Sequence, residues 1–328
     1  TELKVTEARD EYIKAWLAIH VVAKELGISD HKDFIFNISV GYTLEGIKTP
    51  KIDSFINDML DATNTKIWNE STQYLRENID IFDNVTVKDI ESIQANISPS
   101  ITISTMHGCP PEEINSIVEH LVTVKGMHTY VKCNPTLLGY EYARKILDQL
   151  GYDYLSFDQH HFQDDLQWKD AIPMFTHLQK LAKENGLIFG LKLTNTFPVE
   201  IKRSELAGEE MYMSGRALFP LSISLAQQLT EAFNGEMPLS YSGGADALNI
   251  KTIFETGIRP VTVCTTILKP GGYERLKQMA KICEPLLDGG IEKINTSKLT
   301  TIVEGLISSK YNQKYIREIG SRKSESVL

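Results

Sequence analysis

Short apolar runs alternate along the chain with longer segments whose apolar residues recur every three or four positions. The short runs are rich in β-branched residues and predict strands, whereas the longer segments predict amphipathic helices. Seven runs predict strands, at residues 34–40, 101–106, 129–133, 154–157, 188–194, 238–241 and 261–265. Because these runs are nearly continuous in apolar residues, they suit parallel strands that are buried on both faces.

Helical segments separate these strands in a regular series. One predicted helix precedes the first strand, and the others lie at residues 52–62, 111–124, 140–150, 172–184, 220–233, 247–255 and 273–286. Seven strand–helix repeats favour an α/β fold of the (β/α)8 TIM-barrel type, with a doubly wound parallel sheet as the alternative. The chain opens on the helix at residues 7–26, so we expect a barrel that lacks at least one early strand.

Two segments are longer than ordinary connections. Residues 64–99 form a polar stretch that we interpret as a helical insertion, and residues 197–215 follow a predicted strand. Long loops at the carboxyl ends of barrel strands shape active sites, so we predict a lid at 197–215 rather than a plain surface excursion. We assign residues 1–288 to the barrel and 289–328 to a C-terminal helical extension with a polar tail.

The amino-acid composition of the chain limits the kinds of molecule that it is expected to bind. The chain has 328 residues, with 34 Lys and Arg against 43 Asp and Glu, which gives a net charge of −9. Nucleic acids and anionic membranes require a basic face, so we predict neither as a partner and expect a small-molecule substrate instead. The four cysteines show no metal-ligand spacing and suit free thiols in the cytoplasm.

The first chemical candidate is the segment TMHGCPPEE, where a predicted strand ends and a helix begins. Cys109 comes directly before Pro110 and that helix, whose positive end would favour the thiolate. His107 lies two residues earlier and would hold or relay a proton. Both residues are therefore candidate catalytic groups. A buried structural thiol beside a histidine with satisfied hydrogen bonds is an equally good interpretation.

Two lysines lie within predicted strands. Lys132 precedes Asn134 in VKCNP, and Lys192 precedes a second polar group in KLTNT. Strand alternation puts Lys132 and Asn134 on one side of their strand. Buried lysines would neutralise an anion such as a reduced flavin or a phosphate, or would form a Schiff base. The alternative is a pair of outward lysines that reach solvent.

A glycine pair and a threonine pair end the last two predicted strands. Gly243 and Gly244 end one strand, and Thr265 and Thr266 end the next. Glycine turns and helix N-termini present N–H groups to phosphate, and this fold holds phosphate after its last strands. The segment DQHHFQDD, residues 158–165, has residue types that suit a metal, but we favour a polar loop and predict no metal site.

The order of these motifs resembles a known arrangement. CPPEE, VKCNP, TNT, SGRALFPLSISLAQQL, SGG and VCTT resemble the FMN barrel of dihydroorotate and dihydropyrimidine dehydrogenases. TMHGCPPEE, VKCNPTLLGY, EEMYMSGRALFPLS, SYSGGA and LKPGGY resemble the YgfK-type selenate reductase flavoproteins more closely. The second resemblance covers about residues 7–286.

The resemblance implies specific roles in binding FMN. The phosphate would be held by four residues at the last strand ends: Gly243, Gly244, Thr265 and Thr266. Lys132 would lie against the flavin ring, and Asn134 and Asn195 would line the flavin or the substrate. Lys192 and Thr196 complete the predicted cofactor-binding set, and Cys109 would donate a proton. Asp246, directly after SGGA, departs from the family pattern and would repel a phosphate.

The resemblance also implies a longer polypeptide, with iron–sulfur, FAD and NADPH sites in its remainder or in redox partner subunits. We predict that this chain is the barrel of a flavin-dependent oxidoreductase that passes hydride or electrons between FMN and a small substrate. Two alternatives remain open. The first is a Schiff-base lyase or isomerase that uses a barrel lysine, and the second is a non-catalytic barrel that acts as a scaffold in a redox complex.

Overall fold

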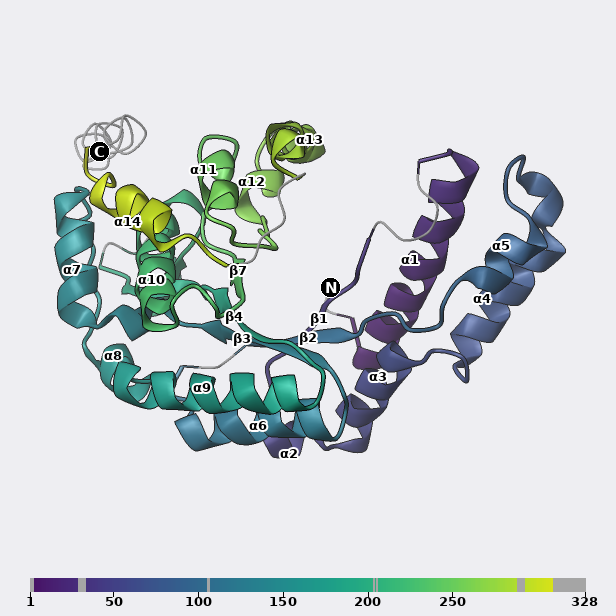
Figure 1. Cartoon of the computed structure of the whole chain (residues 1–328), viewed down its shortest axis with the longest axis horizontal. Coiled ribbons are helices and arrows are strands. Elements are labelled where there is room, and N and C mark those ends of the chain that lie inside the picture. Colours follow the sequence, from purple (N-terminus) through teal and green to yellow (C-terminus); the bar gives the residue numbers. More distant parts are fainter. Residues whose placement is uncertain are drawn as a thin grey trace. The chain divides into compact units, whose positions relative to one another are not determined.

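The computed structural model describes residues 3–28, 34–104, 107–202, 204, 206–287 and 293–308 (Figure 1). The chain divides into two compact units. The first comprises Thr1–Thr102 with His120–Thr129, and the second comprises Ile103–Glu119 with Tyr130–Leu328. None of the helices in the described ranges has the length and apolar character to cross a membrane.

The first unit is built mainly from helices. Its elements are α1 (Val5–Glu25), β1 (Ile38–Val40), α2 (Leu44–Ile47), α3 (Pro50–Leu60), α4 (Lys66–Glu77), η1 (Ile79–Ile81) and α5 (Val87–Ser92). Helix α1 packs against α3 and α4 through residues spaced three or four apart, including the fully buried Ile13. The predicted helix at 7–26 is confirmed, and the predicted insertion at 64–99 contains α4, η1 and α5.

The main sheet has five strands, whose order decides between the two predicted architectures. After β1 come β2 (Ser100–Ser104), β3 (His128–Cys133), β4 (Phe189–Leu193) and β7 (Leu239–Tyr241), and the sheet order is β1-β2-β3-β4-β7. Strands β4 and β7 are parallel. The strands follow one another in chain order, as in a barrel wall, whereas a doubly wound sheet reverses its order. The structure therefore supports the barrel type.

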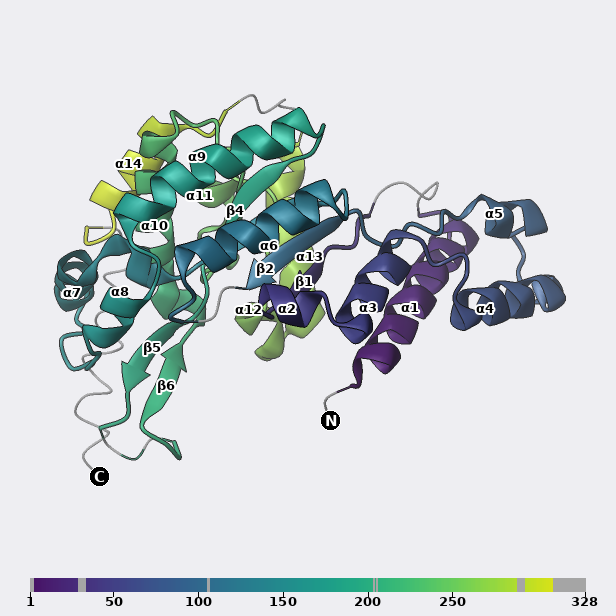
Figure 2. The same cartoon turned by 90° about the horizontal axis from the view of Figure 1, so that it is seen from below.

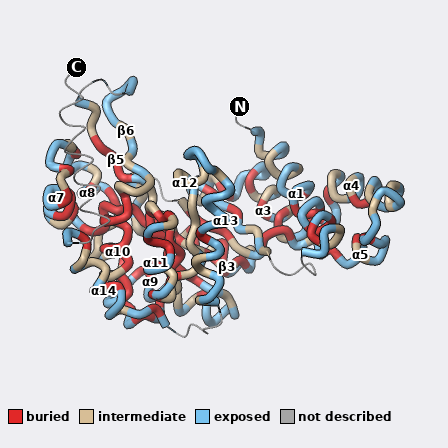
Figure 3. The backbone as a smooth tube through the Cα atoms, turned by 90° about the horizontal axis from the view of Figure 1, so that it is seen from above, coloured by how far each residue is buried: buried red, intermediate tan, exposed pale blue. Residues whose placement is uncertain are grey.

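Helices cover the strands of the second unit. Its helical elements are α6 (Pro111–Thr123), η2 (Pro135–Leu138), α7 (Tyr140–Gln149), α8 (His160–Asp164), α9 (Trp168–Glu184), η3 (Gly215–Leu218), α10 (Phe219–Ala232), α11 (Ile250–Glu255), α12 (Thr265–Leu268), α13 (Gly272–Cys283), η4 (Glu284–Leu286) and α14 (Thr296–Glu304). Helix α9 packs along β4, and the tube of α10 is coloured as buried over most of its length (Figures 1 and 3). These positions confirm the predicted helices.

Two strand predictions are wrong. Residues 154–157 form a loop: Arg144 donates hydrogen bonds to the carbonyls of Tyr152 and Leu155 at 3.0 and 2.8 Å, and the Ser156 carbonyl accepts from the Glu200 N–H at 2.8 Å. Residues 261–265 make only one isolated bridge, between Val261 and Tyr241, before α12 begins at Thr265. Tertiary contacts override the β-propensity of both runs.

The predicted lid segment is a β-hairpin. Strand β5 (Phe197–Glu200) pairs antiparallel with β6 (Glu210–Met213), and Figure 2 shows the two strands side by side at one edge of the second unit. Residues 203 and 205 of this segment lie outside the described residues. The predicted C-terminal extension contains α14, and residues 309–328, which include the polar tail, also lie outside the described residues.

The two faces of the sheet differ in polarity. In β3, Val131 and Cys133 are buried, while Lys132 between them is half-buried on the opposite face. In β4, Lys192 pairs in register with Ser240 of β7, so their side chains share one face. The expectation of strands with two apolar faces is therefore wrong here. We call the side of β3, β4 and β7 that carries Lys132, Lys192 and Ser240 the lysine face.

Candidate active site

The lysine face brings two amines together. Burial lowers the pKa of Lys132, and the nearby Cys264 thiol raises it to a smaller extent. Burial also lowers the pKa of Lys192, and the like charge of Lys132 lowers it further. Two half-buried ammonium groups within electrostatic reach of each other favour a negatively charged neighbour. Both predicted lysines thus lie on the same face.

Tyr130 also belongs to the lysine face. A Cβ at Gly190 would lie 2.4 Å from Cε1 of Tyr130, so the tyrosine ring occupies the space that a side chain at position 190 would fill. Burial raises the pKa of the Tyr130 hydroxyl. The glycine in β4 is therefore required by the ring on the neighbouring strand.

A run of side-chain amides connects the ends of the strands. Asn195 Nδ2 donates to Asn134 Oδ1 at 2.7 Å, and Asn195 Oδ1 accepts from the Ser104 hydroxyl at 3.3 Å. The Asn195 backbone N–H donates to the Cys133 carbonyl at 2.9 Å. The structure thus brings together both predicted asparagines, while the predicted Thr196 is exposed and stands outside the run.

Asp165 is the centre of the hydrogen-bond network. Its carboxylate lies 2.8 Å from His107 Nδ1, and it accepts from the Gly108 N–H at 2.8 Å, the Thr136 hydroxyl at 2.6 Å and Asn134 Nδ2 at 3.1 Å. Its side chain is only 2% exposed. We call these five residues the Asp165 cluster. Sequence reasoning missed the role of Asp165 and Thr136, although Asp165 lies in the polar DQHHFQDD segment.

His107 has a raised pKa. The hydrogen bond to Asp165 is the largest cause, and burial opposes it, while the charges of Asp165 and Glu210 add to the increase. Gly108 follows with φ +76°, a left-handed conformation that turns its N–H toward the carboxylate. The His107 ring therefore binds its proton more tightly than a free imidazole, because it lies against a buried carboxylate.

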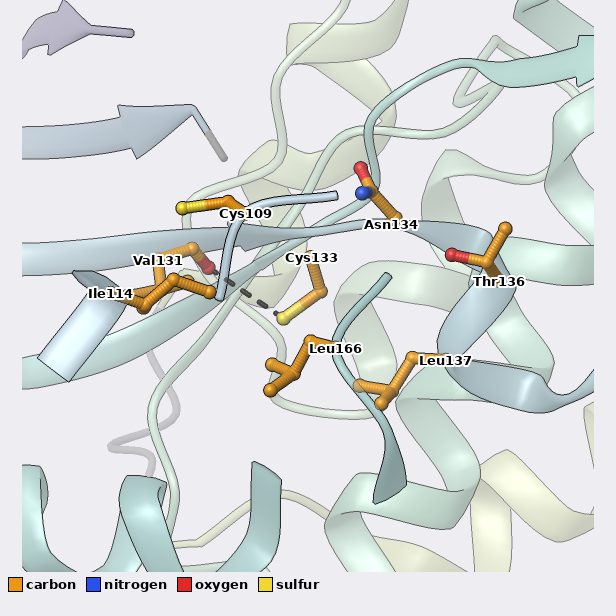
Figure 4. A pocket seen from close by; sticks show the side chains of 8 residues that line it. All are labelled: Cys109, Ile114, Val131, Cys133, Asn134, Thr136, Leu137 and Leu166. Atoms are coloured by element: carbon orange, nitrogen blue, oxygen red, sulfur yellow. Dashed lines mark hydrogen bonds between the residues drawn. The ribbon is translucent and has the colours of Figure 1, made fainter. Parts of the chain in front are cut away.

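Cys109 lies beside a small cavity of about 10 Å³, room for one water molecule (Figure 4). In Figure 4 the sulfur of Cys133 points to the apolar side, toward Ile114 and Leu166, while the Asn134 amide points away from them. Burial raises the pKa of the Cys109 thiol, and the charges of Glu113 and Asp165 raise it further. The predicted thiolate is therefore wrong, because burial and the two carboxylates favour the protonated thiol.

The hairpin reaches the Asp165 cluster. The Tyr212 ring of β6 stacks on His107 with centroids 6.4 Å apart and planes at 21°. His161 lies with its ring centroid 5.1 Å from that of His107, and its Nε2 lies 2.7 Å from Glu210 Oε1. The segment interpreted as a lid thus contacts a predicted catalytic residue.

The predicted phosphate-binding turn is tightly packed. A Cβ at Gly243 would lie 2.1 Å from the Ser222 hydroxyl, and a Cβ at Gly244 would lie 2.2 Å from the Gly215 carbonyl. Gly215 in turn contacts Thr265, while the Thr266 hydroxyl donates to the Ala245 carbonyl at 3.1 Å. All four predicted phosphate residues are therefore close in space.

An ion pair borders this turn. Arg216 donates to Asp246 Oδ2 through Nε at 2.9 Å and Nη2 at 2.7 Å. The expected repulsion between Asp246 and a phosphate is therefore compensated by the guanidinium. Sequence reasoning missed Arg216, although it lies within the SGRALFPLS motif that carried the resemblance. We call Gly243, Gly244, Arg216 and Asp246 the glycine turn.

The cysteines and histidines of the described residues were also candidates for metal binding. In the part of the chain that the structure describes, no three His, Cys, Asp or Glu side chains are arranged to hold a metal ion. All four cysteines are free thiols, and complete burial raises the pKa of Cys133 to about 12. His160 and His161, interpreted as part of a polar loop, lie in the short helix α8.

Two solved structures are similar to the chain at low level. The ligand-free DHODH from Eimeria tenella is 17% identical, with a TM-score of 0.33 over 60% of this chain and 62% of that one. DHODH from the same organism in complex with ferulenol is 18% identical, with a TM-score of 0.36 over 61% and 54%. Structural similarity at these TM-scores says nothing about the site.

Relatives in sequence are much closer. The YgfK proteins of Escherichia coli K12 and O157:H7 are each 43% identical over 327 residues, covering 96% of this chain and 32% of the relative. The chain therefore spans about a third of their length. The family described as "Oxidoreductase YgfK, N-terminal TIM-barrel domain" matches residues 1–314. With the barrel order of the strands, this match shows that the chain belongs to the family of YgfK N-terminal TIM-barrel domains.

Proposed function

We propose that this chain is the FMN-binding barrel of an oxidoreductase. It would hold a small substrate beside the hydrogen-bonded side chains of Ser104, Asn195 and Asn134, which we call the amide run. One observation carries the proposal: two desolvated lysines share a face with the strand ends that bear Asn134 and Asn195. When bound, FMN supplies hydride transfer. The resemblance of the ordered motifs to flavin barrels supports the same assignment.

The described residues fit such a group. An electron-rich ring beside Lys132 and Lys192 would relieve the like-charge repulsion that lowers the pKa of Lys192. Hydrogen bonds from the backbone N–H groups of Gly243, Gly244 and Ala245 to acceptors among the described residues are not found, so these donors are available to an anion. These groups would hold the FMN phosphate, with Arg216 beside them.

The chain's own groups would orient and protonate the substrate. Asn134 and Asn195 have their amides fixed by hydrogen bonds to each other, and they would direct the polar atoms of a substrate. Cys109 keeps its proton at neutral pH because its pKa is raised, so it suits a proton donor. His107 holds a second proton at Nδ1, against Asp165.

Cofactor content tests the proposal directly. We would express this chain and the full-length protein, record their visible absorbance, and identify any released flavin by chromatography. We expect FMN in the full-length protein, and we expect Lys132→Met to reduce its occupancy by about tenfold. The matched control is Lys180→Met, which removes an exposed lysine of α9 and should retain the cofactor. Full-length protein that is purified with its cofactors intact but contains no FMN would overturn the proposal.

The lysine pair also favours a second candidate, a Schiff-base lyase or isomerase. Burial lowers the pKa of Lys192, and the neighbouring Lys132 ammonium group lowers it further, which activates the amine toward carbonyl compounds. Borohydride treatment in the presence of small keto acids and aldehydes, followed by peptide mapping, would then modify Lys132 or Lys192. Labelling confined to exposed lysines would reject this candidate.

The source of electrons is a further part of the proposal. The relatives are about three times as long as this chain, since 32% of each is covered. We propose that the remaining portion, or redox partner subunits, supplies electrons through FAD, NADPH and iron–sulfur sites, as the resemblance implies. Selenate is one candidate for the overall acceptor. NADPH should then bleach the FMN absorbance of the full-length protein in the absence of oxygen, and no bleaching would count against this route.

A further inference from the structure

The Asp165 cluster collects four donors from two separate stretches of the second unit around a carboxylate that lies on a third. Asp165 lies directly after α8, and its residue is 3% exposed. Two donors, His107 and Gly108, come from the stretch that carries Cys109, and the other two, Asn134 and Thr136, follow β3. A single carboxylate therefore connects the stretch that carries the predicted proton donor Cys109 to the predicted substrate-binding amide of Asn134.

Such a carboxylate is stable only with its full set of partners. Burial acts to raise the pKa of Asp165, but the hydrogen bonds from His107, Thr136 and Gly108 outweigh burial and lower it. A buried carboxylate that loses a partner keeps its desolvation cost, so the partners hold one another in place. The arrangement of all five residues is therefore coupled.

His107 is the titratable member of the cluster. The charged and aromatic groups that face it are Asp165, Glu210, His161 and Tyr212, and Cys109 lies two residues along the chain. With Nδ1 held by Asp165, the ring has Nε2 for exchange with other partners. The carboxylate thus sets both the direction of the ring and its protonation.

We propose that Asp165 is the positioning residue of this site: it acts through His107 and the Gly108 N–H to place Cys109, and through Asn134 to place the amide run. This inference rests on the proposed function for the meaning of the site. The positioning itself is a property of the chain and can be measured without any cofactor. No electron transfer is involved, and the only proton concerned stays on His107 Nδ1.

The test uses Asp165→Asn with Asp164→Asn as its matched control. Asp164 is the preceding residue, its side chain is 50% exposed, and it pairs with His160, so the control removes the same charge at the surface. We would follow the His107 ring by NMR over a pH range, and the alkylation of Cys109 by peptide mass spectrometry. We expect Asp165→Asn to lower the His107 midpoint by about one pH unit, toward its ordinary value of about 6.5.

The thiol provides an independent readout. Burial and the charge of Glu113 raise the pKa of Cys109 most, and the charge of Asp165 adds to them, so removal of that charge should measurably increase alkylation at about pH 8. Cys264, which is exposed, serves as the internal reference thiol. If Asp165→Asn moves neither the His107 midpoint nor the Cys109 rate beyond the effect of Asp164→Asn, the proposal is overturned.

A second variant keeps the test decisive if Asp165→Asn fails to fold. Thr136→Val removes one donor from Asp165 and keeps the carboxylate, which then bonds more strongly to His107. We expect the His107 midpoint to rise, opposite in sign to the effect of Asp165→Asn. A fall would indicate general loosening and would contradict positioning by Asp165. The FMN content of the same variants separates the two proposals, since His107 titrates whether or not flavin is bound.

Discussion

The Asp165 cluster and the glycine turn both enclose a nearly buried aspartate, and they do so by opposite means. Asp165 meets four donors, among which the only ionisable one is a histidine. Asp246 meets a permanently charged guanidinium, whose side chain is 31% exposed, and the nearby Leu248 N–H, which donates to it at 2.8 Å. The difference shows that the first site depends on the convergence of distant segments, whereas the second combines an ion pair with a local backbone hydrogen bond and close backbone packing.

The largest expected effect lies at the glycine turn. Gly244→Ala would force φ +75° on an alanine and place its Cβ 2.2 Å from the Gly215 carbonyl. We expect a loss of about 3 to 4 kcal/mol in the free energy of unfolding, measured by urea denaturation. Gly186→Ala is the control, because Gly186 has φ +68° and no atom within 4 Å of the added Cβ. It should cost only about 1 kcal/mol, and equal losses would contradict the packing argument.

The next test compares the two aspartates directly. Asp165→Asn should lower the free energy of unfolding by about 2 to 3 kcal/mol, because its buried donors lose a charged acceptor. Asp246→Asn should cost about 1 kcal/mol, since Arg216 can turn toward water. Thermal or urea unfolding of both variants provides the measurement. If Asp246→Asn proves the more damaging, the ranking of the two regions is reversed.

The lysine face, which adjoins the glycine turn through Ser240 of β7, permits a gain in stability. Lys192→Met removes an ammonium group that is desolvated and repelled by Lys132. Without cofactor, we expect the chain to become more stable by about 1 kcal/mol, while FMN retention in the full-length protein falls. Lys180→Met should change stability by less than about 0.5 kcal/mol. A destabilised Lys192→Met variant would indicate that Lys192 has a structural role.

The smallest effect is a pH dependence that only the Asp165 cluster should show. The pKa of His107 is raised in the folded state, so its contribution to stability is complete below its unfolded pKa of about 6.5. That contribution is lost as the pH rises through the folded value. The stability difference between wild type and His107→Gln, from urea unfolding at several pH values, should therefore shrink above about pH 6.5. A difference that grows with pH would contradict the assignment.

Much of the site could be predicted from the positions of residues at strand ends. Lys132, Asn134 and Asn195 follow or end apolar runs, and the barrel rule places such residues together. The role of Asp165 could not be predicted, because its hydrogen bond to His107 spans 58 residues and no local sequence pattern encodes such a separation. The apolar pattern also predicts a strand at residues 154–157, before Asp165, whereas that stretch is a loop to which Arg144 donates hydrogen bonds.

The fold likewise contains elements that the sequence pattern predicts and elements that it does not. The helices were predictable because their apolar residues recur at helical spacing over ten or more residues. The hairpin of β5 and β6 was not, because its partners Phe197 and Met213 are separated by a polar stretch. The run at 261–265 has high β-propensity, yet it bridges only through Val261, since pairing depends on the neighbouring strand.

The run from Ser104 through Asn195 to Asn134 and Asp165 also has an evolutionary consequence. Each amide has its oxygen and nitrogen assigned by the next residue, so the run has a fixed direction that ends on the carboxylate. A substitution at position 134 would therefore change which hydrogen-bond donor or acceptor is required at positions 165 and 195. Among relatives, these positions should therefore change together or not at all, and a family alignment would show them as one co-inherited set.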